Sequence, residues 1–130
     1  MRRIVQSFGL VSAIAATAVV VPAGTASAAP HCSKGLVTYN IYMPVASDNS
    51  LNCTMGRGSY SNAVLALQLN LNLCYGAGLA EDKDFGPATE AALKAVQRKE
   101  KVAVDGVYGP NTRNAMLWVR GSVGCVKFFS

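Results

Sequence analysis

Two aspartates hold equivalent places in a short repeat, and they are the first candidates for chemistry in this 130-residue chain. Asp82 opens the stretch DKDFGPAT, and Asp105 opens the stretch DGVYGPNT 23 residues later. Hydrolysis of a glycan needs one carboxyl group as acid and a second carboxylate across the scissile bond. Equivalent positions in a repeated turn favour one structural role for both, so we predict turn carboxylates and a chain that is not an enzyme.

Other catalytic or metal-binding arrangements lack the partners that they need. A serine or cysteine nucleophile needs a histidine base, and the one histidine, His31, lies far from the repeat. The cysteines include no C-x-x-C pair, so we expect no zinc site of a known type and no cofactor. The net charge is +5, but the basic residues cluster only at Arg98, Lys99 and Lys101, so nucleic acid is not an expected partner.

Residues 1–28 have the layout of a secretory signal peptide, with two arginines, an apolar run over residues 4–21 and a small-residue stretch at 26–28. A membrane anchor is the alternative. The break at Pro22 and the small-x-small site after it favour cleavage. We therefore expect a secreted mature chain that begins at residue 29 and has no membrane contact after cleavage.

Each copy of the repeat places Gly-Pro directly before an alanine-rich or amphipathic run. Proline is favoured at the first helical position, where its missing N–H costs nothing, so Gly86-Pro87 and Gly109-Pro110 predict two helix starts. The helices are expected over Pro87 to about Lys99 and Pro110 to about Arg120. An earlier helix is expected from a cap near Ser59 to just before Gly76.

The other residues of the repeat predict two copies of one turn. Asp82 and Asp105 can accept backbone N–H bonds, and Gly106 can adopt a positive φ. Gln68 and Gln97 stand in apolar surroundings, so we interpret them as amides that satisfy loop backbone. The remaining turn residues are Phe85 and Tyr108, whose rings would lie under the next helix, and Thr89 and Thr112, whose hydroxyls would fold back to the first helical turn.

About a dozen spaced positions between residues 57 and 118 share one pattern. They are Val64, Leu67-Gln68, Leu71-Asn72, Asp82, Phe85-Gly86-Pro87, Thr89, Ala92, Val96-Gln97, Val104-Asp105-Gly106, Tyr108-Gly109-Pro110, Thr112 and Ala115-Met116. The pattern resembles the peptidoglycan-binding-like domain, a three-helix cell-wall module of many bacterial hydrolases. The resemblance implies a small helical bundle whose shallow surface binds wall polymer. The sequence departs from the family at Lys83-Asp84, where the first turn has no glycine.

The predicted fold is mostly α: a small three-helix bundle with duplicated Asp-x-x-[Phe/Tyr]-Gly-Pro-x-Thr turns, an extended N-terminal segment and tail, and two disulfides. We expect a signal peptide over 1–28, an extension over 29–56, the domain over 57–120 and a tail over 121–130. Alternation over 37–42 indicates a strand or extended strip, the tail 125–129 is also extended in character, and 44–51 is typical of a polar loop.

Candidate binding residues gather at the start of the third helix. Asn111 and Arg113 flank Thr112, where free N–H groups and a cation could meet stem-peptide carboxylates or the hydroxyls and acetamides of the glycan. Tyr108 could stack on a sugar face. We therefore predict a ligand-binding set of Tyr108, Asn111, Thr112 and Arg113.

The first predicted helix has apolar residues on two faces. Val64, Leu67 and Leu71 form its core side, while Leu65, Leu69 and Leu73 recur on nearly the opposite side. An exposed leucine stripe is uncommon on a soluble monomer. Either the N-terminal extension covers it, which we favour, or a partner does, such as a second copy or a cell-wall enzyme without its own targeting module.

Four cysteines in a small secreted chain predict two disulfides, and three pairings are possible. A helix from Ser59 to Cys74 would rise roughly 22 Å, and the preceding segment could run back along it for about 20 Å. We therefore predict the pairs Cys53–Cys74 and Cys32–Cys125.

The functional prediction joins the resemblance to the chain's length. We expect a secreted, non-catalytic module that stands alone, binds peptidoglycan and is found outside the cell or on its wall. The alternative is a secreted interaction or inhibitor protein that keeps the same fold and acts on a protein target.

Overall fold

The computed structural model describes residues 29–128, so the predicted signal peptide over 1–28 lies outside the described residues. The described chain contains, in order, β1 (Lys34–Thr38), β2 (Ile41–Val45), α1 (Asn62–Tyr75), α2 (Pro87–Lys99), α3 (Pro110–Ala115), β3 (Leu117–Arg120) and β4 (Gly124–Lys127). The strands form one antiparallel sheet in the order β1-β2-β3-β4. The prediction of a mostly α three-helix bundle was therefore wrong, because the extension, the last residues of the predicted domain and the tail build a sheet. None of the helices in residues 29–128 has the length and apolar character needed to span a membrane.

The third helix is shorter than predicted, and its loss gives the sheet a strand. α3 ends at Ala115, and Met116 is already extended at φ −83° and ψ 163°. The next residues include Trp118 and Val119, types that favour strands. Trp118 is fully buried and lies opposite Val126 of β4. Pairing and burial of β3 therefore outweigh continuation of the helix toward Arg120.

The predicted strip over residues 37–42 contains a turn rather than one strand. Tyr39 and Asn40 have φ values of 51° and 61°, and they connect Thr38 directly to its partner Ile41. Two left-handed residues between antiparallel strands make a tight hairpin. The second strand runs to Val45, so it takes in the start of the predicted polar loop.

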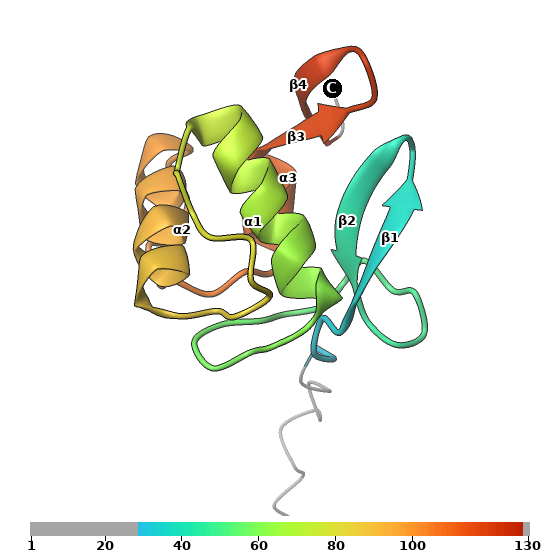
Figure 1. The fold of residues 1–130 in the computed structure, drawn as a ribbon, viewed down its shortest axis with the longest axis horizontal. Coiled ribbons are helices and arrows are strands. Elements are labelled where there is room, and N and C mark those ends of the chain that lie inside the picture. Colours follow the sequence, from blue (N-terminus) through green and yellow to red (C-terminus); the bar gives the residue numbers. More distant parts are fainter. Residues whose placement is uncertain (1–28, 129–130) are drawn as a thin grey trace, which may run out of the picture.

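The β1–β2 hairpin belongs to the core of the domain. It packs against α1 on the side away from α2 (Figure 1). Buried apolar residues come from both the helices and the sheet: Ile41, Met43, Met55, Leu67, Leu71, Phe85, Leu93, Tyr108, Met116 and Trp118. Each large side chain buried from water contributes about 1.5–3 kcal/mol. The extension therefore contributes to the stability of the domain.

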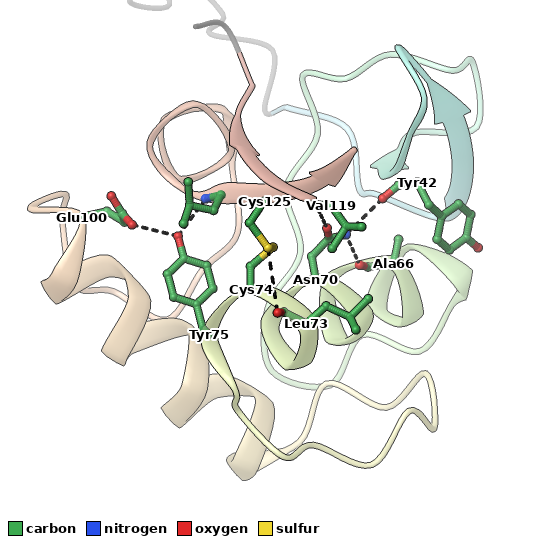
Figure 2. Close-up of a disulfide and its surroundings, with 10 residues drawn as sticks. Tyr42, Ala66, Asn70, Leu73, Cys74, Tyr75, Glu100, Val119 and Cys125 are labelled. Atoms are coloured by element: carbon green, nitrogen blue, oxygen red, sulfur yellow. Dashed lines mark hydrogen bonds between the residues drawn. A yellow bond between two sulfur atoms is a disulfide. The ribbon is translucent and has the colours of Figure 1, made fainter. Parts of the chain in front are cut away.

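A buried asparagine on α1 joins the two halves of the sheet. β2 and β3 share only the residue pair Ile41 and Arg120. Asn70 donates to the carbonyl oxygen of Tyr42 on β2 at 3.2 Å and accepts from the N–H of Val119 on β3 at 2.8 Å (Figure 2). The side chain of Asn70 thus supplies hydrogen bonds where the ladder between the two hairpins is short.

The leucine stripe is only partly covered. α1 begins at Asn62 with Ser61 at the N-cap position, later than the predicted cap at Ser59. Leu65 and Leu69 are half-buried, whereas Leu73 is 65 % exposed. The leucine stripe is therefore partly buried at Leu65 and Leu69, and its last member, Leu73, faces solvent.

Both predicted disulfides were wrong. The bonds are Cys32–Cys53 and Cys74–Cys125. The N–H of Cys32 donates to the carbonyl oxygen of Thr54 at 2.9 Å, so the first two cysteines lie on adjacent segments. The chain after Cys53 crosses to the repeated turns instead of running back along α1. Cys74 at the end of α1 is consequently left to meet Cys125 on β4 (Figure 2).

Candidate functional site

A buried glutamine organises the second copy of the turn. Gln97 Nε2 donates to Asp105 Oδ1 at 2.9 Å, to the Val107 carbonyl oxygen at 3.0 Å and to Thr112 Oγ1 at 3.1 Å. Gln97 Oε1 accepts from the N–H of Gly106 at 3.0 Å. One side chain of α2 therefore fixes the turn and the start of α3.

The first copy repeats these bonds around Gln68 of α1. Gln68 Nε2 donates to Asp82 Oδ1, the Asp84 carbonyl oxygen and Thr89 Oγ1 at 3.0, 3.0 and 3.1 Å. Gln68 Oε1 accepts from the N–H of Lys83 at 3.1 Å. The two threonine hydroxyls thus accept from the glutamines, whereas we had expected them to fold back to the first helical turn.

The repeated aspartates act as acceptors within their turns. Asp82 Oδ1 accepts from the N–H of Asp84 at 3.0 Å, and Asp105 Oδ1 accepts from the N–H of Val107 at 2.9 Å. The bond from Asp84, followed by the bond from Gln68, holds the pKa of Asp82 below its usual range. A carboxylate held ionised in this way is poorly suited to act as a general acid.

The segment before α1 connects the two turns. Met55 and Tyr108 exchange backbone hydrogen bonds of 3.0 and 2.8 Å. In the other copy, the N–H of Phe85 donates to the Ser59 carbonyl oxygen at 2.9 Å. Residues 55–60 therefore hold the two turns in a fixed relation to each other.

A groove of about 650 Å³ lies against the second turn, and we call it the second-turn groove. Its lining residues are Thr54, Val102, Ala103, Asp105, Val107, Gly109, Pro110, Asn111, Thr112, Asn114 and Ala115. Asn111 and Asn114 are exposed and lie three residues apart on α3, so they share one face of the helix. Amide groups above apolar walls can bind neutral polar ligands through paired donors and acceptors.

The four predicted binding residues do not share one role. Asn111 is exposed in the second-turn groove, whereas Thr112 is 6 % exposed and bonded to Gln97. Arg113 is also 6 % exposed, and it donates to the Leu51 carbonyl oxygen at 2.6 Å. The cation of Arg113 is therefore taken up inside the fold.

Tyr108 is fully buried, edge-on to Trp118 with ring centroids 6.1 Å apart. Burial raises the pKa of its phenol. A ring without exposed surface cannot stack on a sugar, so that expectation for Tyr108 was wrong.

Two polar residues that line the second-turn groove, Asn114 and Thr54, were missed in the sequence. Asn114 could have been found, because it follows Asn111 at helical spacing. Thr54 lies in the predicted extension and reaches the second-turn groove through the fold, so no local pattern indicates it.

The first turn has a smaller counterpart of about 180 Å³, which we call the first-turn groove. Most of its lining is offset by 23 residues from that of the larger groove. Ala88 replaces Asn111, and Asp84 replaces Val107. The turn scaffold is thus repeated, whereas the exposed chemistry differs.

Within residues 29–128, His, Cys, Asp and Glu do not form any group of three or more that could hold a metal ion.

Comparisons with known proteins find a match over the segment that holds the turns and helices. Residues 60–116 match the family model described as a putative peptidoglycan binding domain, which confirms the resemblance over that segment. A zinc D-Ala-D-Ala carboxypeptidase of Streptomyces albus G is 43% identical over 63 residues, covering 47% of this chain and 25% of the relative. The N-acetylmuramoyl-L-alanine amidase CwlL of Bacillus licheniformis is 36% identical over 73 residues, covering 54% of this chain and 20% of the relative. The chain spans about a quarter or less of the length of these curated relatives.

One similar solved structure is the fused Zn-dependent amidase/peptidase/peptidoglycan-binding domain-containing protein of Clostridium acetobutylicum. It is 33% identical to this chain with a TM-score of 0.46, and the match covers 48% of this chain and 28% of that one.

Proposed function

Since residues 60–116 match the model of a putative peptidoglycan binding domain, we propose that this chain is a cell-wall module that binds peptidoglycan in its second-turn groove. The observation that carries the proposal is the exposure of Asn111 and Asn114 together in that groove, inside the matched segment. The Gln97 bonds hold the start of α3 in place, so the two amides are preorganised.

The chemistry of the second-turn groove fits the glycan part of the polymer. Its exposed amides can donate to and accept from acetamide and hydroxyl groups. Val107 and Pro110 supply apolar surface for the faces of the sugar rings. With Arg113 engaged inside the fold, a neutral ligand fits this groove better than a carboxylate.

The proposed module is secreted and does not catalyse a reaction. Two disulfides are typical of proteins in an oxidising compartment. Both repeated aspartates accept bonds inside their turns, which argues against an acid and nucleophile pair. The curated relatives are named as a carboxypeptidase and an amidase, but the short span of the match gives no ground to transfer those activities.

Sedimentation with insoluble, protein-free peptidoglycan tests the proposal. The wild-type protein should pellet with the wall, and the Asn111→Ala, Asn114→Ala double variant should bind about tenfold more weakly. Because Asn114 Oδ1 accepts from Arg113 Nε at 3.1 Å, sedimentation is compared at a temperature at which circular dichroism shows both proteins folded. Asn62→Ala, at an exposed asparagine outside the groove, is the matched control and should bind like the wild type. A wild-type protein that stays in solution at every salt concentration would favour the interaction or inhibitor function, and a double variant retained like the control would place the site elsewhere.

A further inference from the structure

A separate groove of about 520 Å³ runs along α2, and we call it the α2 groove. One wall is a row of alanines that includes the exposed Ala88, Ala91 and Ala95, spaced three and four residues apart. The other wall is the segment 77–80, which follows α1. Small side chains on the helix leave space there for an extended backbone to approach closely.

The two ends of this surface carry opposite charges. At one end Lys99 lines the groove, with its ammonium 5.5 Å from the centre of the Tyr75 ring. At the other end the α2 groove adjoins the first-turn groove, since both are lined by Leu79, Ala80 and Ala88. There the exposed side chains of Asp82 and Asp84 bring negative charge.

The separation of these ends fits a short peptide. Ala88 and Lys99 stand in the first and last turns of α2, so they lie about 16 Å apart along the helix axis at 1.5 Å per residue. Three extended residues cover about 10 Å of that length, and a long basic side chain on the first of them can reach over the rest. A charge at each end of the occupant would meet its opposite on the protein.

We propose that the α2 groove binds the stem peptide of peptidoglycan, with the ammonium of its diamino acid toward Asp84 and its terminal carboxylate toward Lys99. This inference rests on the proposed function, because the wall polymer supplies the peptide, and it adds a second subsite to that for the glycan. Small alanine residues of a stem peptide fit the alanine wall, and the two end charges fix the direction of the chain.

Titration with a free peptide tests this subsite apart from the whole wall. The probe is N-acetyl-L-Ala-γ-D-Glu-L-Lys-D-Ala-D-Ala, followed by the NMR amide signals of the full chain. It should shift the signals of Ala91, Ala95 and Lys99. Acetylating the probe's free amine or amidating its carboxyl terminus should each weaken binding about tenfold.

Matched variants assign the charges. Lys99→Gln should weaken binding of the free-carboxylate probe about tenfold and leave binding of the amidated probe unchanged. Arg98→Gln is the control, because Arg98 is next in sequence but does not line the groove, and it should change the affinity for neither probe. Asp84→Asn should weaken binding of the probe with a free amine about tenfold and leave binding of the acetylated probe unchanged. Ala95→Leu should block both probes, since a larger side chain at an exposed helical position fills the groove without disturbing the core.

The outcomes separate this inference from the proposed function. The inference is supported if the signals that shift are confined to the α2 groove and still shift in the Asn111→Ala, Asn114→Ala variant. The affinity for the peptide must also depend on both end charges of the probe. Shifts at Asn111 and Asn114 instead, or affinity indifferent to either end charge, overturn it. Retention on whole peptidoglycan without any binding of the free peptide would also overturn it while leaving the proposed function intact.

Discussion

Among single residues, the clearest contrast between the two turns is Lys83 against Gly106. Their φ values are 66° and 69°, and each donates its N–H to the glutamine of its own turn. A left-handed conformation is strained for lysine and free of strain for glycine. Beside Gly106, an added Cβ would also lie 2.8 Å from Cγ of Glu90.

Exchange at these two positions should have opposite effects. We expect Lys83→Gly to raise the free energy of unfolding by about 0.5–1 kcal/mol, because relief of strain exceeds the added entropy of the unfolded chain. Gly106→Ala should lower it by about 1–2 kcal/mol through strain and the contact with Glu90. Urea denaturation of both variants beside the wild type measures this. If both variants changed the free energy of unfolding by the same amount in the same direction, the two turns would not share the requirement for a left-handed residue at this position.

The candidate site could be predicted from the sequence only where exposure follows from local pattern. The repeated turn places Asn111 at the start of a helix, and its partner Asn114 follows by helical spacing. Tyr108 and Arg113 have side chains that suit ligand binding, yet both are buried. Tyr108 packs edge-on against Trp118 of β3, a strand that the sequence did not predict. The Arg113 guanidinium lies 5.2 Å from the ring centre of Phe128, which directly follows β4.

Among the elements, helix boundaries marked by glycine or proline were easier to predict than the end of α3 or the strands. Proline after glycine sets the first residue of α2 and α3 through a local steric preference. The end of α3 depends on the pairing of β3 with β4, which is not local. The hairpin turn at Tyr39-Asn40 contains no glycine, so Asn40 alone favours its left-handed backbone and the turn signal in the sequence is weak.

The two disulfides differ in exposure as well as in position. Cys32 and Cys53 are buried, whereas Cys125 is exposed on β4 and Cys74 is half-buried at the end of α1. The second bond ties the β3–β4 hairpin to α1 (Figure 2). This bond therefore matters for the attachment of an element that has only one residue pair with β2.

We expect a mild thiol reductant to open Cys74–Cys125 before Cys32–Cys53 under native conditions, because the reductant must reach a sulfur. Removing the exposed bond by Cys74→Ala with Cys125→Ala should cost about 4 kcal/mol on a chain-entropy estimate, against about 3 kcal/mol for the shorter loop. Timed alkylation with peptide mapping gives the order of opening. Earlier labelling of Cys32 and Cys53 would contradict it.

For the whole molecule, one polar network joins β3 and β4 to the C-terminal ends of α1 and α2. The Tyr75 hydroxyl donates to Glu100 Oε1 at 2.8 Å and accepts from the N–H of Leu117 at 2.7 Å (Figure 2). Lys127 donates to Glu100 and to the Ala115 carbonyl oxygen. Burial pushes the pKa of Glu100 upward, but the bonds from Lys127 and Tyr75 outweigh it and hold that pKa below its usual value of 4.5.

This network predicts part of the acid sensitivity of the protein. A carboxyl group with a lowered folded pKa stabilises the fold above its unfolded pKa, and the contribution disappears as the pH falls through the folded pKa. Glu100→Gln should therefore cost about 1–2 kcal/mol at pH 7 and much less near pH 3. Melting temperatures of both proteins from pH 7 to pH 3 measure the difference, and a constant gap would exclude Glu100 as a contributor.

The two disulfides close separate stretches of chain, residues 32–53 and 74–125, and neither loop overlaps the other. A chain delivered from its N-terminus presents Cys53 to Cys32 before either of the later thiols has emerged. Oxidation in order of appearance then gives the native connectivity at once, without thiol–disulfide exchange to correct it. This order would let a dedicated oxidant alone, with no isomerase, complete the covalent structure.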